Sequence, residues 1–277
     1  MLKNTLNSIS PLDGRYATKL GDLEQYFSEF ALIKNRVLVE INWLIFMSQT
    51  KSLSFVPILS KNKETSLLKI IDEFSLKDAE QIKKIEAKTN HDVKAVEVFI
   101  GKKLESLNLK KYKEFVHLFC TSEDINNLSY SLMLKGYLDN EFKQINSSFL
   151  KDLKSKSKKW SKLSMLSFTH GQTASPTTLG KEIANFHERI KYHLNLLKSL
   201  NPSGKFNGAV GNYNAHVITD DKVNWQSLSE KFVKSLGLNW SKYSTQIELK
   251  DEMVTIISTM ENLNNVLLDL SKDCWLY

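Results

Sequence analysis

The chain of 277 residues is 42% hydrophobic and 25% charged, a balance typical of a soluble globular protein with one large domain or two smaller ones. Its two cysteines, Cys120 and Cys274, form no C-x-x-C pair and no apolar run approaches the ~20 residues of a membrane span, which argues against a disulfide framework, a zinc site and a membrane protein. The net charge of +7 comes from lysines interspersed with acidic residues, so we expect a cytoplasmic protein with a solvated surface and with neither nucleic acid nor membrane as a partner.

Apolar residues recur at spacings of three and four along most of the chain, and proline occurs only four times, which predicts an all-α protein. One apolar stripe runs from Leu23 to Leu44 and a second from Val93 to Leu104. The same spacing from Ser122 to about residue 159 predicts one long helix that belongs to a long-helix bundle. We expect a small N-terminal helical domain at residues 1–110, followed by an incomplete central helical-bundle domain at residues 111–277.

A loop rich in Gly, Thr and Pro interrupts this pattern between residues 167 and 180. It places His170 shortly before an amphipathic helix expected to begin near Leu179. A histidine in a loop can meet a substrate, and the ordinary pKa of histidine suits proton transfer near neutral pH. His170 is therefore the first candidate for a general acid or base. The alternative is a loop histidine that only caps or orients its neighbours.

Small polar residues open three of the expected helices, at residues 89–92, 121–124 and 177–178. Each group can be a helix N-cap, and the second resembles a capping box with Asp in place of Glu. Helix N-termini also bind anions, because free N–H groups and the positive end of the helix dipole converge there. Both interpretations stay open. His91 and Asp92 are adjacent and share no helical face, so we expect no metal site there.

Two further segments combine glycine with a cationic side chain. Residues 204–212 bring Lys205 together with flexible backbone, which suits a carboxylate or phosphate, although a turn that uses glycine for positive φ is the alternative. Residues 13–16 join a turn to the guanidinium of Arg15 and the phenol of Tyr16. This pair could hold a phosphate or could simply be surface.

The last expected helix has the most regular apolar pattern in the chain. Its apolar residues have spacings of 3, 4, 3, 4, 3 and 4 and are Met253, Ile256, Met260, Leu263, Leu267, Leu270 and Cys274. This pattern predicts a coiled-coil-like seam that needs partner helices. Because the chain stops after Trp275-Leu276-Tyr277 with no glycine cap or polar tail, we expect a C-terminal truncation in mid-helix.

Six segments together resemble the N-terminal three fifths of the bacterial adenylosuccinate lyases, a family of the fumarase/aspartase superfamily. The matching segments, in chain order, are residues 10–16, 89–97, 120–127, 169–172, 204–216 and 245–248. The resemblance implies a fumarase/aspartase-like helical fold and a homotetramer whose active sites are shared between three subunits. It also implies β-elimination of fumarate from adenylosuccinate, giving AMP, and from the succinylated aminoimidazole-carboxamide ribotide, with no metal or redox cofactor.

The resemblance also implies roles for individual residues. His170 is similar to the general acid that protonates the departing nitrogen. The positions similar to those that hold the nucleotide and succinyl portions are Arg15, Tyr16, Asn90, His91, Asp92, Thr121, Ser122 and Gln246.

The chain departs from the family pattern in several places. The family's mobile loop, which carries the serine base, and its C-terminal helical domain are absent from the 277 residues. Phe168 stands where arginine is usual. Leu249-Lys250 stands where the family more typically has a proline followed by arginine or histidine. We therefore expect these 277 residues alone to be inactive. The alternatives are a non-catalytic oligomerising or interaction protein and, less favoured, a basic nucleic-acid binder.

Overall fold

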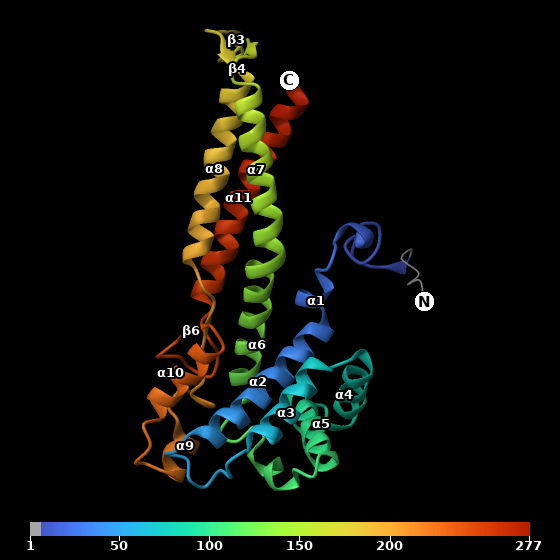
Figure 1. Ribbon diagram of the computed structural model, residues 1–277, viewed down its shortest axis with the longest axis vertical. Coiled ribbons are helices and arrows are strands. Elements are labelled where there is room, and N and C mark those ends of the chain that lie inside the picture. Colours follow the sequence, from blue (N-terminus) through green and yellow to red (C-terminus); the bar gives the residue numbers. More distant parts are fainter. Residues whose placement is uncertain (1–6) are drawn as a thin grey trace. The chain divides into compact units, whose positions relative to one another are not determined.

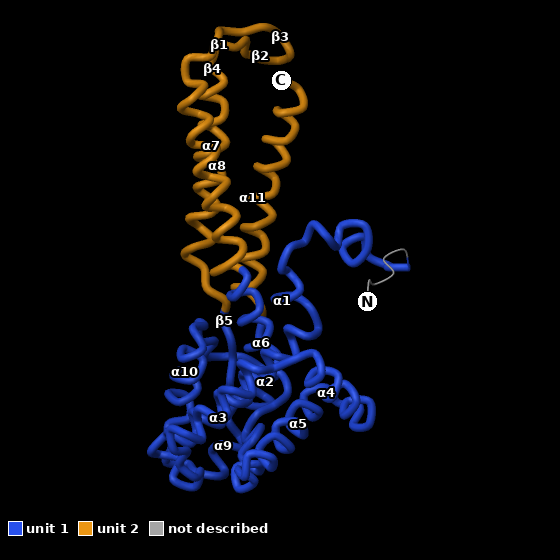
Figure 2. The backbone as a smooth tube through the Cα atoms, turned by 45° about the vertical axis from the view of Figure 1, so that its right-hand side comes forward, with its two compact units in different colours: residues 1–137, 203–249 blue, residues 138–202, 250–277 orange. Residues whose placement is uncertain are grey.

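The computed structural model describes residues 7–277, which are mostly helical (Figure 1). This confirms the all-α fold class. The chain divides into two compact units, one formed by residues 1–137 and 203–249 and the other by residues 138–202 and 250–277 (Figure 2). The domain boundary expected near residue 110 falls inside the first unit and stays a prediction. Within the described residues no helix is long and apolar enough to cross a membrane.

The first unit is built from short and medium helices. They are the 3-10 helix η2 (Ala17–Lys19), α1 (Glu24–Phe27), α2 (Glu29–Gln49), α3 (Lys61–Asp72), α4 (Leu76–Thr89), α5 (Asp92–Ser106), the 3-10 helix η3 (Lys110–Phe115), α6 (Ser122–Tyr137), α9 (Asn214–Thr219) and α10 (Trp225–Ser235). Within residues 203–249 of this unit, the strands β5 (Ser203–Gly204) and β6 (Asn239–Trp240) form a two-stranded parallel pair.

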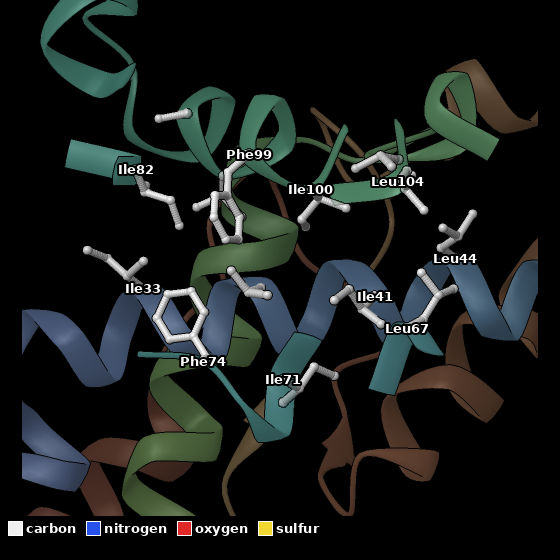
Figure 3. Close-up of a cluster of buried hydrophobic side chains, with 14 of the residues drawn as sticks. Ile33, Ile41, Leu44, Leu67, Ile71, Phe74, Ile82, Phe99, Ile100 and Leu104 are labelled. Atoms are coloured by element: carbon white, nitrogen blue, oxygen red, sulfur yellow. The ribbon is translucent and has the colours of Figure 1, made fainter. Parts of the chain in front are cut away.

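Helix α2 contributes to both hydrophobic clusters of this unit. Its Ile33, Val37 and Ile41 pack with residues of α3, α4 and α5 in the first cluster (Figure 3). Trp43, in the second cluster, lies 4.5 Å from Phe206 and 5.0 Å from Phe232, measured between ring centroids. The second cluster therefore joins α2 to residues more than 160 positions later, and α2 is the central element of the unit.

Polar residues define the helix ends that matter for the site. Ser75 and Asp78 form a capping box at the start of α4. That helix ends at Asn90, which has the left-handed φ of 50° that asparagine tolerates. The chain turns there and α5 begins at once, with His91 as its N-cap. Asn90 and His91 therefore owe their positions to the join between two helices.

The second unit contains three long helices and two antiparallel pairs of two-residue strands. Its elements are a π-helical turn η4 (Leu138–Phe142), α7 (Lys143–Lys159), β1 (Ser164–Met165), β2 (Phe168–Thr169), β3 (Gln172–Thr173), β4 (Thr177–Thr178), α8 (Leu179–Ser199) and α11 (Asp251–Leu276). Strand β1 pairs with β4 and β2 with β3, both antiparallel. Residues 122–159 are helical throughout, as expected, with the π-helical turn η4 between α6 and α7.

Helix α8 packs against both α7 and α11. The contact with α7 is tight at Gly180, where an added Cβ would lie 2.2 Å from the Ser157 carbonyl oxygen. Thr178 caps α8 by accepting from the Lys181 N–H at 3.3 Å, as expected for the cap region.

The seam expected on α11 is only partly buried. The buried residues of this helix are Ile256, Thr259, Leu263 and Val266, so the expected seam shares two of its seven members with the buried stripe. Cys274 is exposed, and the remaining members are half-buried. The helix therefore buries a face rotated from the expected seam and leaves apolar surface on its other side.

Candidate active site

His91 and Ser122 lie together at the N-termini of two helices of the first unit. His91 caps α5, where its Nδ1 accepts from the Lys94 N–H at 3.1 Å. Its Nε2 lies 3.3 Å from Oγ of Ser122, the first residue of α6. The neutral ring must carry its proton on Nε2, because Nδ1 already accepts a hydrogen bond. The ring therefore donates to Ser122, whose own O–H is left to donate elsewhere.

Asp92 joins this pair to the interior of the unit. One carboxylate oxygen accepts from the Val93 N–H at 2.8 Å, and the other lies 2.6 Å from the guanidinium of Arg36. Burial raises the pKa of Asp92, but the Val93 N–H and the Arg36 charge outweigh it and hold that pKa below its ordinary value. The carboxylate thus stays ionised close to His91.

A buried ion pair fixes the start of α6. Both side chains of Lys205 and Asp124 are fully buried, with 2.9 Å between ammonium and carboxylate. Asp124 also accepts from the backbone N–H groups of Thr121, Asn207 and Gly208 at 2.9 to 3.1 Å. The Thr121 contact is the backbone half of the capping box expected from sequence. Lys205 also donates to the Gly208 carbonyl, so the loop at 204–212 uses its lysine for an internal bond and not for a ligand.

His170 lies in the second unit at the tip of the β2–β3 hairpin. His170 and Gly171 have φ values of 52° and 71°, which identifies a two-residue turn of the kind that joins hairpin strands. Every residue from Phe168 to Thr173 is exposed. The imidazole is therefore presented to solvent by a short turn, and its role as a general acid stays a prediction.

The structure brings together only some of the expected site residues. Asn90, His91, Asp92, Thr121 and Ser122 belong to the helix junction just described. Asn90, His91 and Asp92 line an open cavity of about 650 Å³ whose other lining residues are Lys83, Glu86 and Ala87.

Arg15 and Tyr16 lie in the exposed turn before η2. The Arg15 guanidinium is 5.5 Å from the centre of the Tyr16 ring. Within residues 7–277 neither side chain has a hydrogen bond or ion pair with His91 or Ser122. The expected pairing of Arg15 with Tyr16 is present, while its link to a phosphate stays a prediction.

Gln246 is exposed on the loop between β6 and α11. Two contacts, made by Glu248 and Gly211, hold this loop in place. The Glu248 carboxylate accepts from the hydroxyls of Ser203 and Ser241 at 3.1 and 3.0 Å. Gly211 packs on the same loop, since an added Cβ would lie 2.3 Å from the Ser244 carbonyl oxygen. The loop therefore presents Gln246 from a fixed base.

Sequence reasoning missed the charged and polar groups that support these residues. Arg36 carries no local motif, because its partners Asp92 and Asn126 are 56 and 90 positions away in the chain, and Asn126 and Glu248 lie in matching segments without having been given a supporting role. A polar residue within an apolar stripe, such as Arg36 in α2, is the one signal that could have found them.

A second buried carboxylate, Glu40, holds His117. Its two oxygens lie 2.6 Å from His117 Nδ1 and 3.1 Å from the His117 backbone nitrogen, which donates. Burial lowers the pKa of His117, but the hydrogen bond and charge of Glu40 outweigh that effect and leave the pKa above its ordinary value. Glu40 belongs to α2 and His117 to the segment that leads into α6, so the pair ties that segment to α2.

Comparison with known proteins gives one consistent family. A family model described as Lyase matches residues 14–277. The chain is 42% identical over 275 residues to an adenylosuccinate lyase of Buchnera aphidicola subsp. Schizaphis graminum, covering 99% of this chain and 60% of that protein. It is 42% identical over 278 residues to the adenylosuccinate lyase of Haemophilus influenzae, covering 100% of this chain and 61% of that protein. The chain thus spans about three fifths of the length of the curated relatives it matches.

Solved structures with the same fold are more distant in sequence. A fumarate lyase from Mesorhizobium superposes with a TM-score of 0.74 at 16% identity, covering 92% of this chain and 56% of that one. The β-carboxy-cis,cis-muconate cycloisomerase of Acinetobacter calcoaceticus gives a TM-score of 0.72 at 20% identity, covering 95% and 59%. These likenesses establish the fold.

Proposed function

The chain belongs to the Lyase family, within the fumarase/aspartase superfamily, and from this premise we propose that it forms the nucleotide-binding and proton-donating part of an adenylosuccinate lyase. The reaction is β-elimination of fumarate from adenylosuccinate, giving AMP, and from the succinylated aminoimidazole-carboxamide ribotide. The observation that supports it most directly is the pairing of His91 with Ser122 at two helix N-termini.

This pairing suits a substrate that carries a phosphate and two carboxylates. The free N–H groups and positive dipole ends of α5 and α6 favour anions. Since His91 donates to the Ser122 oxygen, the Ser122 O–H can donate to a substrate anion. We assign Asn90, Asp92 and Thr121 to the same subsite, and Arg15, Tyr16 and Gln246 to further contacts with the nucleotide.

His170 is the proposed general acid. Cleavage of the C–N bond needs a proton on the departing nitrogen, and the carbanion beside a carboxylate needs clustered donors. An exposed imidazole at the tip of a hairpin turn can approach such a nitrogen without disturbing a core.

We propose further that the protein acts in the cytoplasm as a homotetramer. Both cysteines are free, which fits a reducing compartment. Val254, Ile257 and Leu268 of α11 are 58%, 54% and 60% exposed, and side chains of this kind along one helix favour a partner helix. The same observation favours the second candidate function, a non-catalytic oligomerising protein.

Calorimetric titration with AMP tests the proposal and separates the two candidates. We expect the chain to bind AMP and Arg15→Ala to weaken that binding, because a guanidinium pairs with phosphate through two hydrogen bonds. Arg189→Ala is the matched control, since Arg189 forms an exposed ion pair with Asp269 in the other unit. Adenylosuccinate cleavage is then followed by ultraviolet absorbance after adding the part of the Haemophilus influenzae relative that lies beyond the match. A chain that assembles but binds no AMP supports the non-catalytic candidate.

A further inference from the structure

Arg36 is the buried residue that connects the two helix N-termini of the candidate site. It extends from the middle of α2, and its side chain is only 8% exposed. Its Nη2 lies 2.6 Å from an Asp92 carboxylate oxygen at the start of α5. Its Nε donates to the Asn126 side-chain oxygen at 2.8 Å. Arg36 thus contacts α5 and α6 at once.

Each contact lies one step from the pair that faces the substrate. Asp92 follows His91 directly, and Asn126 lies one helical turn after Ser122 on α6. The planar guanidinium fixes the directions of both contacts, which a flexible ammonium would not do. Arg36 therefore ties together the residues beside His91 and Ser122.

We propose that Arg36 is a positioning residue that keeps the His91 ring hydrogen-bonded to Ser122. This inference rests on the proposed function only for the statement that the pair receives a substrate anion. Without Arg36, α5 and α6 lose a common partner and Ser122 moves away from Nε2, while the Lys94 N–H still holds the ring proton on Nε2. The Ser122 hydroxyl then loses its fixed orientation.

The test observes the His91 ring directly, by two-dimensional NMR of the full chain with ¹⁵N-labelled histidine at pH 8.5, above the ordinary pKa of histidine. The chain has six histidines, and a His91→Gln variant assigns the His91 signals. We expect the two ring nitrogens of His91 to have the widely separated shifts of a single Nε2–H tautomer. In Arg36→Met the tautomer should stay the same, because the Lys94 N–H still occupies Nδ1, but the Nε2–H signals should move to those of a ring that donates to water, and in Arg36→Lys they should lie in between.

The matched control is Arg189→Met, which removes a similar contact of 2.8 Å between arginine and aspartate, but in the other unit. It should leave the His91 signals unchanged. A merely structural role for Arg36 would lower the unfolding midpoint and leave the His91 Nε2–H signals unchanged in the folded chain, and that result would overturn the proposal. If Arg36→Met does not fold, Asn126→Ala replaces it. Unchanged His91 signals in both Asn126→Ala and Arg36→Lys would then overturn the proposal.

Calorimetry with AMP on the same variants separates this inference from the proposed function. Weaker AMP binding by Arg36→Lys together with a shifted His91 signal supports both. A shifted His91 signal in a chain that never binds AMP supports the positioning role and contradicts the nucleotide assignment. Normal AMP binding by Arg36→Met with an unshifted signal contradicts the positioning role alone.

Discussion

The ammonium of Lys205 lies 2.9 Å from the carboxylate of Asp124, and neither side chain reaches solvent. The carboxylate also accepts three backbone N–H groups, from Thr121, Asn207 and Gly208. One buried charge thus holds the first turn of α6 and a loop 80 residues later in a single arrangement. The orientation of Ser122 depends on this arrangement, because Ser122 follows Thr121 directly.

The first prediction concerns the cost of breaking this pair. Lys205→Met should lower the free energy of unfolding by about 3–5 kcal/mol, because it leaves the Asp124 charge buried without its partner. Lys234→Met is the control: its contact with Glu230 is shorter, at 2.6 Å, but the lysine side chain is 61% exposed, so the loss should be about 0.5 kcal/mol or less. Urea unfolding followed by tryptophan fluorescence measures both. Equal losses in the two variants would show that burial does not decide the effect.

The second prediction concerns acid. His216 is 1% exposed among Phe119, Tyr213 and Trp225, and burial lowers its pKa from 6.5 to about 4. Because the unfolded chain binds the proton first, stability is full above pH 6.5 and should fall by about 3 kcal/mol as pH drops to about 4.

A His216→Phe variant should lose much of this acid dependence, since phenylalanine keeps the ring and cannot titrate. His117 has the opposite sign: its raised pKa gives stability that is present below pH 6.5 and is lost as pH rises through the folded value. Unfolding midpoints from pH 4 to 9 check both. An acid limb as steep in His216→Phe as in the parent chain would contradict the assignment.

The third prediction compares two helical glycines. Gly180→Ala should destabilise the chain by about 1–3 kcal/mol, because the new Cβ meets α7 backbone atoms that cannot move without separating the helices. In Gly136→Ala the nearest atom is a Tyr26 ring carbon at 3.4 Å, an ordinary contact, so the better helix propensity of alanine should stabilise by up to about 1 kcal/mol. Thermal unfolding gives the two signs. The same sign for both would mean that propensity outweighs the close packing at Gly180.

The fourth prediction separates proton transfer from turn geometry at His170. The assay adds to the chain the part of the Haemophilus influenzae relative that lies beyond the match. In that mixture His170→Ala should lower turnover roughly 10²-fold or more, because the departing nitrogen loses its acid. His170→Asn should be equally inactive, although asparagine favours the positive φ of this turn. Neither change should alter the unfolding midpoint, because the side chain is exposed. Recovery of activity in the asparagine variant would assign His170 a purely conformational role.

Much of the fold follows from local pattern alone. The apolar stripes of α5 and α8 were predicted because apolar residues at spacings of three and four lie on one face of a helix, and that face is buried in both helices. The seam of α11 was predicted less well. Both Met260 and Thr259 lie within a turn of Leu263, and the threonine is the buried one of the two, with its hydroxyl donating to the Thr255 carbonyl. A choice between overlapping faces depends on the neighbour, which one helix does not encode.

The candidate site divides in the same way. The helix starts at His91 and Ser122 and the turn at His170 were predicted because caps and glycine turns have short-range signatures, while the roles of these residues stay predictions. Arg36 and Lys205 depend on partners 56 to 90 positions away, and a single sequence does not identify such partners. The lysine in the glycine loop illustrates the limit, because a ligand and an internal counter-charge require the same residue type.

The second hydrophobic cluster also affects how the chain is synthesised. Trp43 leaves the ribosome long before Phe206 and Phe232, the rings that cover it. At 5–20 residues per second, translation of the intervening segment takes roughly 10 to 30 s. During that time the nascent α2 exposes an indole and the apolar residues beside it. Chaperones that bind such surfaces have their longest opportunity in this interval, and premature release of the chain before residue 232 would favour aggregation over folding.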